Sequence, residues 1–500
     1  ACSAPPVGRD SFHLNIHGMS PFGAPQSARG PKERPPTVER TTYRPVPFPN
    51  VAPLVEPSKF GQTAPVSMQV SQYRAKARPA TPEDFAKVFL VYTRDNPGLV
   101  MDILKERGFN KSKLGNYGTN SVVLQWVEFR RDADFRIVAK AKAKGTTYLV
   151  NHVKSLVMID KSGLLEVIRG ICGNRFPPPW FPLTFDVPEE LHKLQHYALQ
   201  HPEVRWIYKP RQGACGRGIQ LLQRYDDVNL GTLPGVVQRY VTRPALIHQR
   251  KFDLRMYCLI ARVDPLLVLY RNGFVRRSLA KYNENSQSMA VHLTNVSQQR
   301  KSSKPFADKQ QDMVWSPEQM EEYFVESKAV APGWFNQVLV PQMKSILMQL
   351  IEGSRKDIRP LRGCFQLLGV DILLTERMEP VLMEVNGQPA WKMATPWLKE
   401  VKTSLMNDAM DIVLWAHEVD GVDRLPYNSR TVDPKKFHVL IDEDLGFYYR
   451  APEPPPAANS RPQKDRTRSG SRDPGGGKAV GTGTTGAGSA ASALPQLAAG

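Results

Sequence analysis

The chain has 500 residues and a formal net charge of +19, enough length for two or three packed domains and a charge that favours an acidic partner. Its five cysteines are scattered, so neither a disulfide framework nor a cysteine-based zinc site is expected. No apolar run approaches the roughly 18 residues of a membrane-spanning helix, and the start lacks the pattern of a secretory signal. We therefore expect a location in the cytoplasm and no membrane partner.

The two ends of the chain differ in composition from its middle. Residues 1–80 are rich in Pro, Arg, Ser and Gly and follow neither a helical nor a strand period. Residues 451–500 combine a basic stretch with a tail of Gly, Ala, Ser and Thr. Such segments bury too little apolar surface to fold, so we predict that both ends are disordered. The folded part is predicted at about 82–448.

Within the folded part, local patterns predict a mixture of helices and strands. A helix start is predicted at Thr81, where a capping residue precedes proline and two acids, and a strand over 121–129. Further helices are predicted over about 161–170, 188–200, 316–326, 341–356 and 398–418. Short strands with glycine turns follow residue 204, and the last hairpin pairs about 363–374 with 380–386. This mixture indicates an α+β fold.

The first candidate site is a strand, a glycine loop and a second strand within 205–222. Lys209 ends the first strand, and Arg217 lies at the loop tip among glycines. Without Cβ atoms, glycines let backbone N–H groups approach phosphates closely. No helix follows directly, so the stretch is neither a P-loop nor a Rossmann turn. A plain glycine hairpin explains it equally well when it is taken alone.

The second candidate site is the strand-like stretch 251–260, where side chains alternate between two faces. Polar and apolar residues occupy opposite faces, with Lys251, Asp253, Arg255 and Tyr257 against Phe252, Leu254, Met256 and Cys258. Its flanks add cations and hydrogen-bonding groups, namely Gln238 to Val241 upstream and Arg276, His292, Thr294 and Asn295 downstream. An exposed, self-paired ladder of charges is the alternative, but this density of polar groups suits a nucleotide pocket better.

The third candidate site lies in the final hairpin. Glu384 and Asn386 are two residues apart and share a face, which Asp371 can meet from the neighbouring strand. Hard oxygen ligands on two rigid strands suit a Mg²⁺ ion that also holds ATP phosphates. The neighbouring residues are strongly apolar, so a carboxylate buried there needs a partner or a metal. A salt-bridged edge hairpin is the alternative.

Together and in this order, these stretches resemble the tubulin–tyrosine-ligase-like ligases, a family with an ATP-grasp fold. The resemblance covers roughly 145–420, in the motifs W-I-Y-K-P…G-R-G-I, V-V-Q-R-Y-V, K-F-D-L-R-M-Y, N-G-F-V-R, H-L-T-N and L-G-V-D…L-M-E-V-N-G-Q-P-A. It implies an ATP-grasp-type fold with mixed or antiparallel sheets and flanking helices. N-terminal and central subdomains are expected over 81–200, the ATP-grasp region over 201–420 and a C-terminal extension over 421–450. The sequence departs from the family pattern at Trp391, where the family usually has no tryptophan.

The resemblance also implies a role for each matching residue. ATP phosphates would be bound by Lys209 and by the loop residues Gly216, Arg217, Gly218 and Ile219. The adenine would lie against Gln238, Arg239, Tyr240 and Val241. The Mg²⁺ ion would be held by Asp371, Glu384 and Asn386. The catalytic pocket for phosphates, acceptor carboxylate and amino acid would be lined by Lys251, Asp253, Arg255 and Arg276, with Thr294 and Asn295 beside them.

The implied reaction joins a free amino acid to a protein carboxylate through an acyl phosphate made from ATP. The acceptors in the family are the acidic tails of tubulin, which match the basic charge of this chain. General similarity is greatest to the polyglycylases, which extend glycine chains. Glutamate is the alternative amino acid, with Arg271 or Arg277 as the cation for its extra carboxylate. Microtubules, and by the same resemblance cilia or axonemes, are the expected location.

Three other functions remain as alternatives. A non-catalytic microtubule-binding relative would typically have lost one of the three predicted metal ligands, and this chain keeps all three. Nucleic-acid binding would fit the charge, but the basic tails lack the interleaved aromatic residues of a base-stacking surface. An ATP-grasp ligase with a small-molecule acceptor would leave K-F-D-L-R and H-L-T-N unexplained.

Overall fold

The computed structural model describes residues 87–113, 121–141, 146–173, 177–211, 213, 216–222, 234–302, 311–417 and 436–452. The described residues up to Arg450 belong to one compact unit that combines helices with three sheets, an α+β fold as predicted. Every helix in these segments is too short or too polar to span a bilayer. The ends predicted to be disordered lie outside the described residues, apart from 451–452. The domain boundaries at 200 and 420 stay predictions.

The N-terminal sheet is parallel, with strand order β2-β1-β3-β4. Its elements are β1 (Lys87–Tyr92), α2 (Pro97–Glu106), β2 (Asn110–Lys111), β3 (Val122–Val127), η1 (Arg130–Asp132), α3 (Phe135–Ala141) and β4 (Thr147–Val150). The strand predicted over 121–129 is confirmed as β3. The helix start predicted at Thr81 lies outside the described residues, and from Lys87 the chain is a strand, because the stretch 88–92 is rich in β-branched and aromatic residues.

A small antiparallel sheet follows, with strand order β5-β8-β6-β7. Its elements and the helices before it are η3 (Val157–Ile159), α4 (Lys161–Cys172), β5 (Thr184–Val187), α5 (Leu191–Gln200), β6 (Trp206–Pro210), β7 (Gln220–Leu222) and β8 (Gly235–Arg239). Helix α4 passes the end predicted at Gly170 and stops at Gly173, whose φ of 57° is a left-handed conformation that glycine adopts easily. The helix predicted over 188–200 is confirmed from Leu191 onward.

The central sheet is antiparallel, with strand order β14-β13-β10-β11-β15-β16, and β12 and β9 pair with β11 and β10. Its strands are β9 (Leu246–Ile247), β10 (Arg250–Val263), β11 (Leu266–Arg277), β12 (Val314–Trp315), β13 (Gln366–Leu374), β14 (Pro380–Asn386), β15 (His438–Asp442) and β16 (Phe447–Tyr448). The helices are α6 (Met289–His292), α7 (Val296–Ser302), η5 (Gln311–Met313), α8 (Pro317–Glu326), η6 (Phe335–Leu339), α9 (Val340–Ser354) and α10 (Pro396–Ala416). The final hairpin and the last three predicted helices are therefore confirmed.

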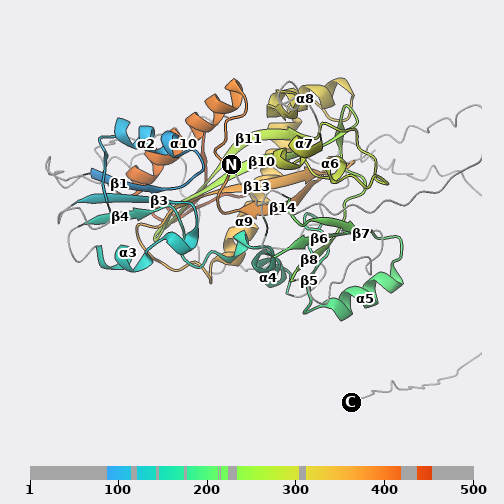
Figure 1. Ribbon diagram of the computed structural model, residues 1–500, viewed down its shortest axis with the longest axis horizontal. Coiled ribbons are helices and arrows are strands. Elements are labelled where there is room, and N and C mark those ends of the chain that lie inside the picture. Colours follow the sequence, from blue (N-terminus) through green and yellow to red (C-terminus); the bar gives the residue numbers. More distant parts are fainter. Residues whose placement is uncertain are drawn as a thin grey trace, which may run out of the picture. The chain divides into compact units, whose positions relative to one another are not determined.

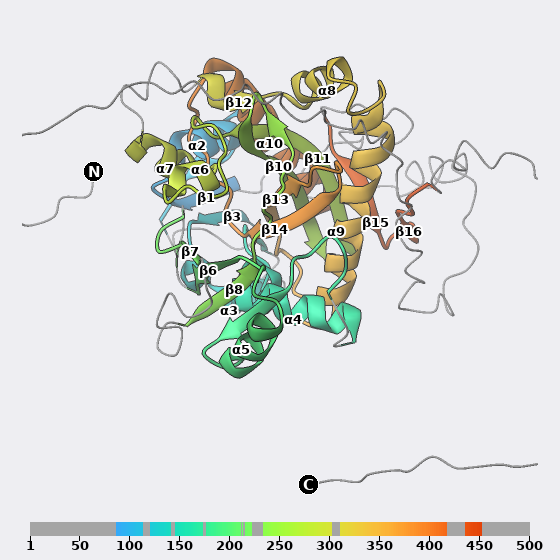
Figure 2. The same ribbon diagram turned by 90° about the vertical axis from the view of Figure 1, so that its right-hand side faces the viewer.

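Both faces of the central sheet are covered, which determines where polar side chains can go. In β10, Phe252 and Leu254 belong to a hydrophobic core shared with α8 and α9, and α9 runs along the sheet in Figure 2. Tyr257 and Leu259 belong to a second core shared with α10 and the N-terminal sheet. In Figure 1 the central sheet lies between the parallel sheet and the small antiparallel sheet. A charged residue in such a strand must find a partner, because burial of a lone charge is costly.

Candidate active site

A cavity of about 910 Å³ brings most of the predicted site residues together. It is lined by residues of the small sheet, the central sheet, α10 and the segment around α6 and α7. The predicted residues that line it are Lys209, Gly216, Arg217, Ile219, Gln238, Arg239, Tyr240, Val241, Lys251, Asp253, Arg255, Arg276, Thr294, Asn295, Asp371, Glu384 and Asn386. Gly218 does not line the cavity and instead shapes the loop, with a φ of 72°. The three stretches singled out in the sequence therefore meet in one place.

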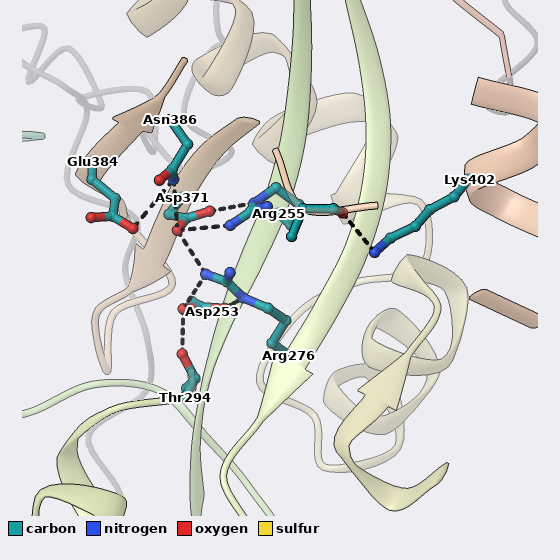
Figure 3. A network of polar contacts seen from close by, with 9 residues as sticks. Asp253, Arg255, Arg276, Thr294, Asp371, Glu384, Asn386 and Lys402 are labelled. Carbon is teal, nitrogen blue, oxygen red and sulfur yellow. Dashed lines mark hydrogen bonds and ion pairs between the residues drawn. The ribbon is translucent and has the colours of Figure 1, made fainter. Parts of the chain in front are cut away.

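A buried network of two aspartates and two arginines lines this cavity, and Figure 3 shows their contacts. Arg255 donates to Asp371 from Nε at 2.6 Å and from Nη2 at 3.2 Å. Arg276 donates to Asp253 at 2.7 and 2.8 Å and also reaches Asp371 Oδ2 at 2.8 Å. Thr294 Oγ1 donates to Asp253 at 2.5 Å. Burial alone would raise the pKa of Asp371, but the two guanidinium groups hold it well below its usual range.

The register of three neighbouring strands builds this network. Arg255 in β10 lies opposite Asp371 in β13, and Asp253 lies opposite Arg276 in β11. Gly273 in β11 allows the close approach of β10, because a Cβ atom there would lie 2.0 Å from the carbonyl oxygen of Arg255. The alternation of polar residues predicted for β10 is confirmed, and the cross-strand partners explain how its charges are tolerated.

Asp371, Glu384 and Asn386 form the predicted metal-binding set. Asn386 Nδ2 lies 3.3 Å from Asp371 Oδ2 and 3.2 Å from Glu384 Oε1, so the three side chains converge. Burial raises the pKa of Glu384, and the neighbouring charge of Asp371 raises it further. In the described part of the chain, no group of three or more His, Cys, Asp or Glu residues is arranged so that it could hold a metal ion. Two carboxylates and one amide are hard oxygen donors, a set that fits Mg²⁺ and whose repulsion a divalent cation would relieve.

Lys209 in β6 of the small sheet is buried, and its side chain reaches the hairpin that carries the predicted metal-binding set. Its Nζ donates to Gln238 Oε1 at 2.7 Å and to the carbonyl of Met383 at 3.4 Å. Gln238 in turn donates to Thr184 Oγ1 at 2.9 Å, which fixes the orientation of its amide. Burial lowers the pKa of Lys209 to about 8, against the attraction of Glu384. An anionic ligand in the cavity would raise this pKa again by favouring the charged form.

The segment predicted to bind adenine runs from the end of β8 into the following loop. The backbone N–H groups of Arg239 and Tyr240 donate to the carbonyls of Leu183 and Arg205 at 2.7 and 2.8 Å. These two donors are therefore occupied within the protein.

Lys251 is held by a chain of hydrogen bonds. Its Nζ donates to the hydroxyl of Tyr240 at 3.1 Å and lies 4.5 Å from the centre of that ring. Tyr240 contacts His292 Nδ1 at 2.8 Å, and His292 Nε2 lies 2.8 Å from the carbonyl of Ser286. Because a carbonyl only accepts, Nε2 carries the proton and Tyr240 donates to Nδ1. Burial lowers the pKa of Lys251 to about 7, with Asp253 acting in the opposite direction.

The two arginines suggested for a glutamate side chain lie away from the cavity, so that expectation is wrong for both. Arg271 donates to Asp408 Oδ2 at 2.5 Å, on the side of the sheet that α10 covers. Arg277 donates to the carbonyl of Asp312 at 2.6 Å and lies 4.5 Å from the ring centre of Trp315. Both residues belong to β11, where Arg271 faces α10 and Arg277 faces the segment around Asp312 and Trp315, so neither lines the cavity.

Lys402 is a cavity residue that the sequence analysis did not identify. It belongs to α10, is 4% exposed and donates to the carbonyls of Ala390 at 2.8 Å and Lys392 at 2.6 Å. A signal was available, because Lys402 lies four residues after Leu398 and three before Leu405, on the buried face of the helix. A lysine at a core position of an amphipathic helix usually has a specific partner.

Trp391, the position at which the sequence departs from the family pattern, anchors the segment after β14. Its side chain is 2% exposed and packs edge-on against Trp126 of β3, with ring centroids 6.5 Å apart. Its backbone N–H donates to Asp95 Oδ2 at 2.7 Å. The tryptophan therefore ties the segment that follows the metal-binding set to the N-terminal sheet.

Comparison with known proteins places the chain in a family. The model of the tubulin-tyrosine ligase family matches residues 141–420. Protein polyglycylase TTLL10 of Macaca fascicularis is 27% identical over 277 residues, which are 50% of this chain and 45% of that protein. Probable tubulin polyglutamylase TTLL9 of Mus musculus is 30% identical over 290 residues, 49% of this chain and 61% of that protein. The inactive polyglycylase TTLL10 of Homo sapiens is 28% identical over 277 residues, 50% of this chain and 41% of that protein.

The chain thus spans about half the length of these relatives. Two of these relatives are named polyglycylases, one of them inactive, and the third is named a probable polyglutamylase. The relatives therefore agree on the family but differ in the activity that their names give. The family match covers more than half of the 500 residues and contains all the residues that line the cavity except Asn96. By this match, the protein belongs to the tubulin-tyrosine ligase family.

Proposed function

We propose that this protein is an ATP- and Mg²⁺-dependent ligase that attaches glycine to a carboxylate on an acidic tail of tubulin. The proposal is carried by one observation. The buried cations Lys209 and Lys251 line the same cavity as the predicted metal-binding set, which includes Asp371. The fold would be of the ATP-grasp type. Lys209 belongs to the small sheet, and the predicted metal-binding set belongs to the central sheet. A nucleotide bound by both would therefore lie between the two sheets.

A carboxylate is a poor electrophile, and phosphorylation by ATP would convert it to an acyl phosphate. Mg²⁺ held by Asp371, Glu384 and Asn386 would supply positive charge next to the phosphates. Arg255 and Arg276 would stabilise the charge that develops as the acceptor carboxylate meets the γ-phosphate. Their ion pairs keep both guanidinium groups in a fixed orientation before the reaction, so little reorganisation is needed.

The second half of the reaction would be displacement of phosphate by the amine of a free amino acid. The nitrogen forms a bond to the acyl carbon, the bond from that carbon to the phosphate oxygen breaks, and orthophosphate leaves. The amine loses its proton as the amide forms. Positioning and charge stabilisation are sufficient for this chemistry, so the chain needs no covalent nucleophile of its own.

Glycine is supported by the overall resemblance to polyglycylases and by the name of the Macaca relative. The two arginines suggested for glutamate lie away from the cavity, which removes one argument for that amino acid. Glutamate stays the alternative, because the Mus relative is named a polyglutamylase at a slightly higher identity.

The net charge of +19 supports an acidic acceptor, and we infer that the protein acts at microtubules, with cilia or axonemes as the proposed site. A tagged full-length protein should then be enriched on microtubules or axonemes. An even distribution through the cell would contradict this location.

The activity is tested by ATP-dependent incorporation of labelled glycine, and separately labelled glutamate, into microtubules with and without a glycyl primer. The E384Q variant serves as the blank, after its folding has been checked by circular dichroism. Glycine incorporation that requires the primer and is lost in E384Q is the expected result. Incorporation of glutamate alone would keep the ligase and replace the amino acid, whereas no incorporation of either would overturn the proposed activity.

A further inference from the structure

Lys402 is a buried cation at the cavity that belongs to none of the ion pairs in the described part of the chain. Arg255 and Arg276, which line the same cavity, are each paired with an aspartate. The acceptors of Lys402 are two backbone carbonyls, which leave one of its three ammonium protons available. Asp95 attracts it electrostatically but forms no ion pair with it in the described part of the chain; Asp95 Oδ2 accepts from the backbone of Trp391, and Oδ1 has no hydrogen-bond partner among the described residues. A buried ammonium group of this kind favours an anionic ligand.

The proposed reaction brings three kinds of anion into the cavity. Lys209 and Lys251 would bind the phosphates of the nucleotide. Arg255 and Arg276 would bind the acceptor carboxylate as it meets the γ-phosphate. The third anion is the carboxylate of the free amino acid, which takes no part in bond making but must be held so that the amine is presented correctly. Once the phosphates and the acceptor carboxylate are assigned, Lys402 is the buried cation lining the cavity that still has no ligand.

The position of Lys402 agrees with binding of the carboxylate of the free amino acid. In Figure 3 it extends from α10 toward Arg255 and Arg276, on the side of these arginines that faces away from Glu384. Both guanidinium groups are close enough to Lys402 to lower its pKa, after the larger effect of burial. The two arginines therefore separate Lys402 from the predicted metal-binding set.

We propose that Lys402 binds the α-carboxylate of the incoming amino acid. The inference rests on the proposed ligase function and assigns a residue to its second substrate. The cavity wall near Lys402 includes the apolar side chains of Phe274 and Leu398, and the ring of Phe274 lies 5.7 Å from Nζ. An apolar wall disfavours a second carboxylate on the ligand, so this end of the cavity suits a small amino acid such as glycine.

Direct binding tests the inference without the need for turnover. Equilibrium dialysis would measure labelled glycine, and separately labelled glutamate, on the full chain with Mg²⁺ and a non-hydrolysable ATP analogue. The variants are K402M, K402R and the matched control K399M, which removes an exposed lysine from the preceding turn of α10. We expect K402M to weaken glycine binding about 10- to 100-fold, as for the loss of one charge-assisted hydrogen bond. K402R should retain part of the affinity, and K399M all of it.

Competition by glycinamide separates ligand binding from support of the loop at 390–392. Glycinamide has no carboxylate, so it should compete poorly for the wild-type protein, and the preference for glycine should disappear in K402M. If Lys402 only supported the loop, the K402M change would weaken glycine and glycinamide to the same degree. That parallel loss would overturn the inference, as would unchanged glycine binding in K402M or no binding of either amino acid by the wild type.

The binding experiment and the transfer experiment distinguish the carboxylate site from the ligase function. Binding that depends on Lys402, combined with no transfer of amino acid to microtubules, would overturn the proposed reaction and leave the carboxylate site standing. Lys402-dependent binding of glutamate in preference to glycine would likewise support the site and reject glycine as the substrate.

Discussion

Arg255 and Asp371 form a two-point ion pair across neighbouring strands, with Nε–Oδ1 at 2.6 Å and Nη2–Oδ2 at 3.2 Å. Their side chains are 9% and 3% exposed, and the residues lie opposite each other in the β10–β13 register. Asp371 is therefore shared between the arginines of the cavity and the predicted metal-binding set. Because Asp371 also pairs with the arginines, its loss should affect the stability of the fold differently from the loss of Glu384.

The two acids of the metal-binding set should differ in their effect on stability. D371N leaves Arg255 without its partner and should lower the free energy of unfolding by about 3 to 5 kcal/mol, as for a broken buried ion pair. E384Q removes one of two repelling carboxylates and should change it by less than about 1 kcal/mol. Urea unfolding would measure both variants, and equal losses would contradict this difference. The proposed function also predicts that Mg²⁺ with ADP stabilises the wild type, and both variants should lose this gain.

The glycine beside Arg255 should be intolerant of substitution. A Cβ atom on Gly273 would lie 2.0 Å from the Arg255 carbonyl oxygen, so G273A must displace β11 from β10 and should cost about 1 to 3 kcal/mol. The matched control is G170A in α4, where no atom lies within 4 Å of the added methyl group. Alanine there should stabilise the protein by about 0.5 to 1 kcal/mol, because glycine lowers helix stability. Thermal unfolding of the two variants should therefore shift in opposite directions.

Trp391 should stabilise the protein mainly through its ring. W391A removes a side chain that is 2% exposed and should cost about 3 to 5 kcal/mol. The indole nitrogen has no hydrogen-bond partner within the described residues, so W391F sacrifices no such bond and should cost clearly less. Guanidinium unfolding of both variants checks the order. A W391F loss as large as that of W391A would show that the indole nitrogen has a partner after all.

Lys344 in α9 should make stability depend on pH in the alkaline range. Its Nζ lies 3.1 Å from His438 Nδ1 and about 5 to 6 Å from the ring centres of Tyr270 and Tyr449. Burial lowers the pKa of Lys344 from 10.5 to about 8. The folded state therefore releases this proton first, and stability rises as the pH increases from about 8 to 10.5. Below pH 8 both states are charged and the cost of burying the charge is fully present.

The K344M variant isolates this contribution. The difference in unfolding free energy, wild type minus K344M, should increase from pH 8 to pH 10, since methionine has no proton to lose. The exposed lysine just after the same helix supplies the control K356M, whose curve should run parallel to that of the wild type. A constant difference between wild type and K344M across this range would show that Lys344 keeps its proton in the folded protein.

Local patterns were sufficient for much of the fold. The helix predicted at 316–326 is confirmed, and the structure adds a capping box at Ser316 and Gln319 that fixes its start. The hairpin that carries Asp371 and Glu384 follows from two apolar runs around a polar turn. The same patterns placed the end of α4 two residues early, because a glycine near the end of a helix is not always its terminus. The true stop is Gly173, the residue with positive φ.

The sequence by itself determined which residues could act together, because alternation along β10 places Lys251, Asp253 and Arg255 on one face. It also indicated the family, through motifs that occur in a fixed order. Only the tertiary structure decided which charges reach the cavity. Strand register pairs Arg255 with Asp371 and directs Arg271 to Asp408 instead, and the packing of α10 against the central sheet brings Lys402 to the cavity. These contacts join residues more than 100 positions apart, and their register depends on packing between sheets and helices that no local pattern encodes.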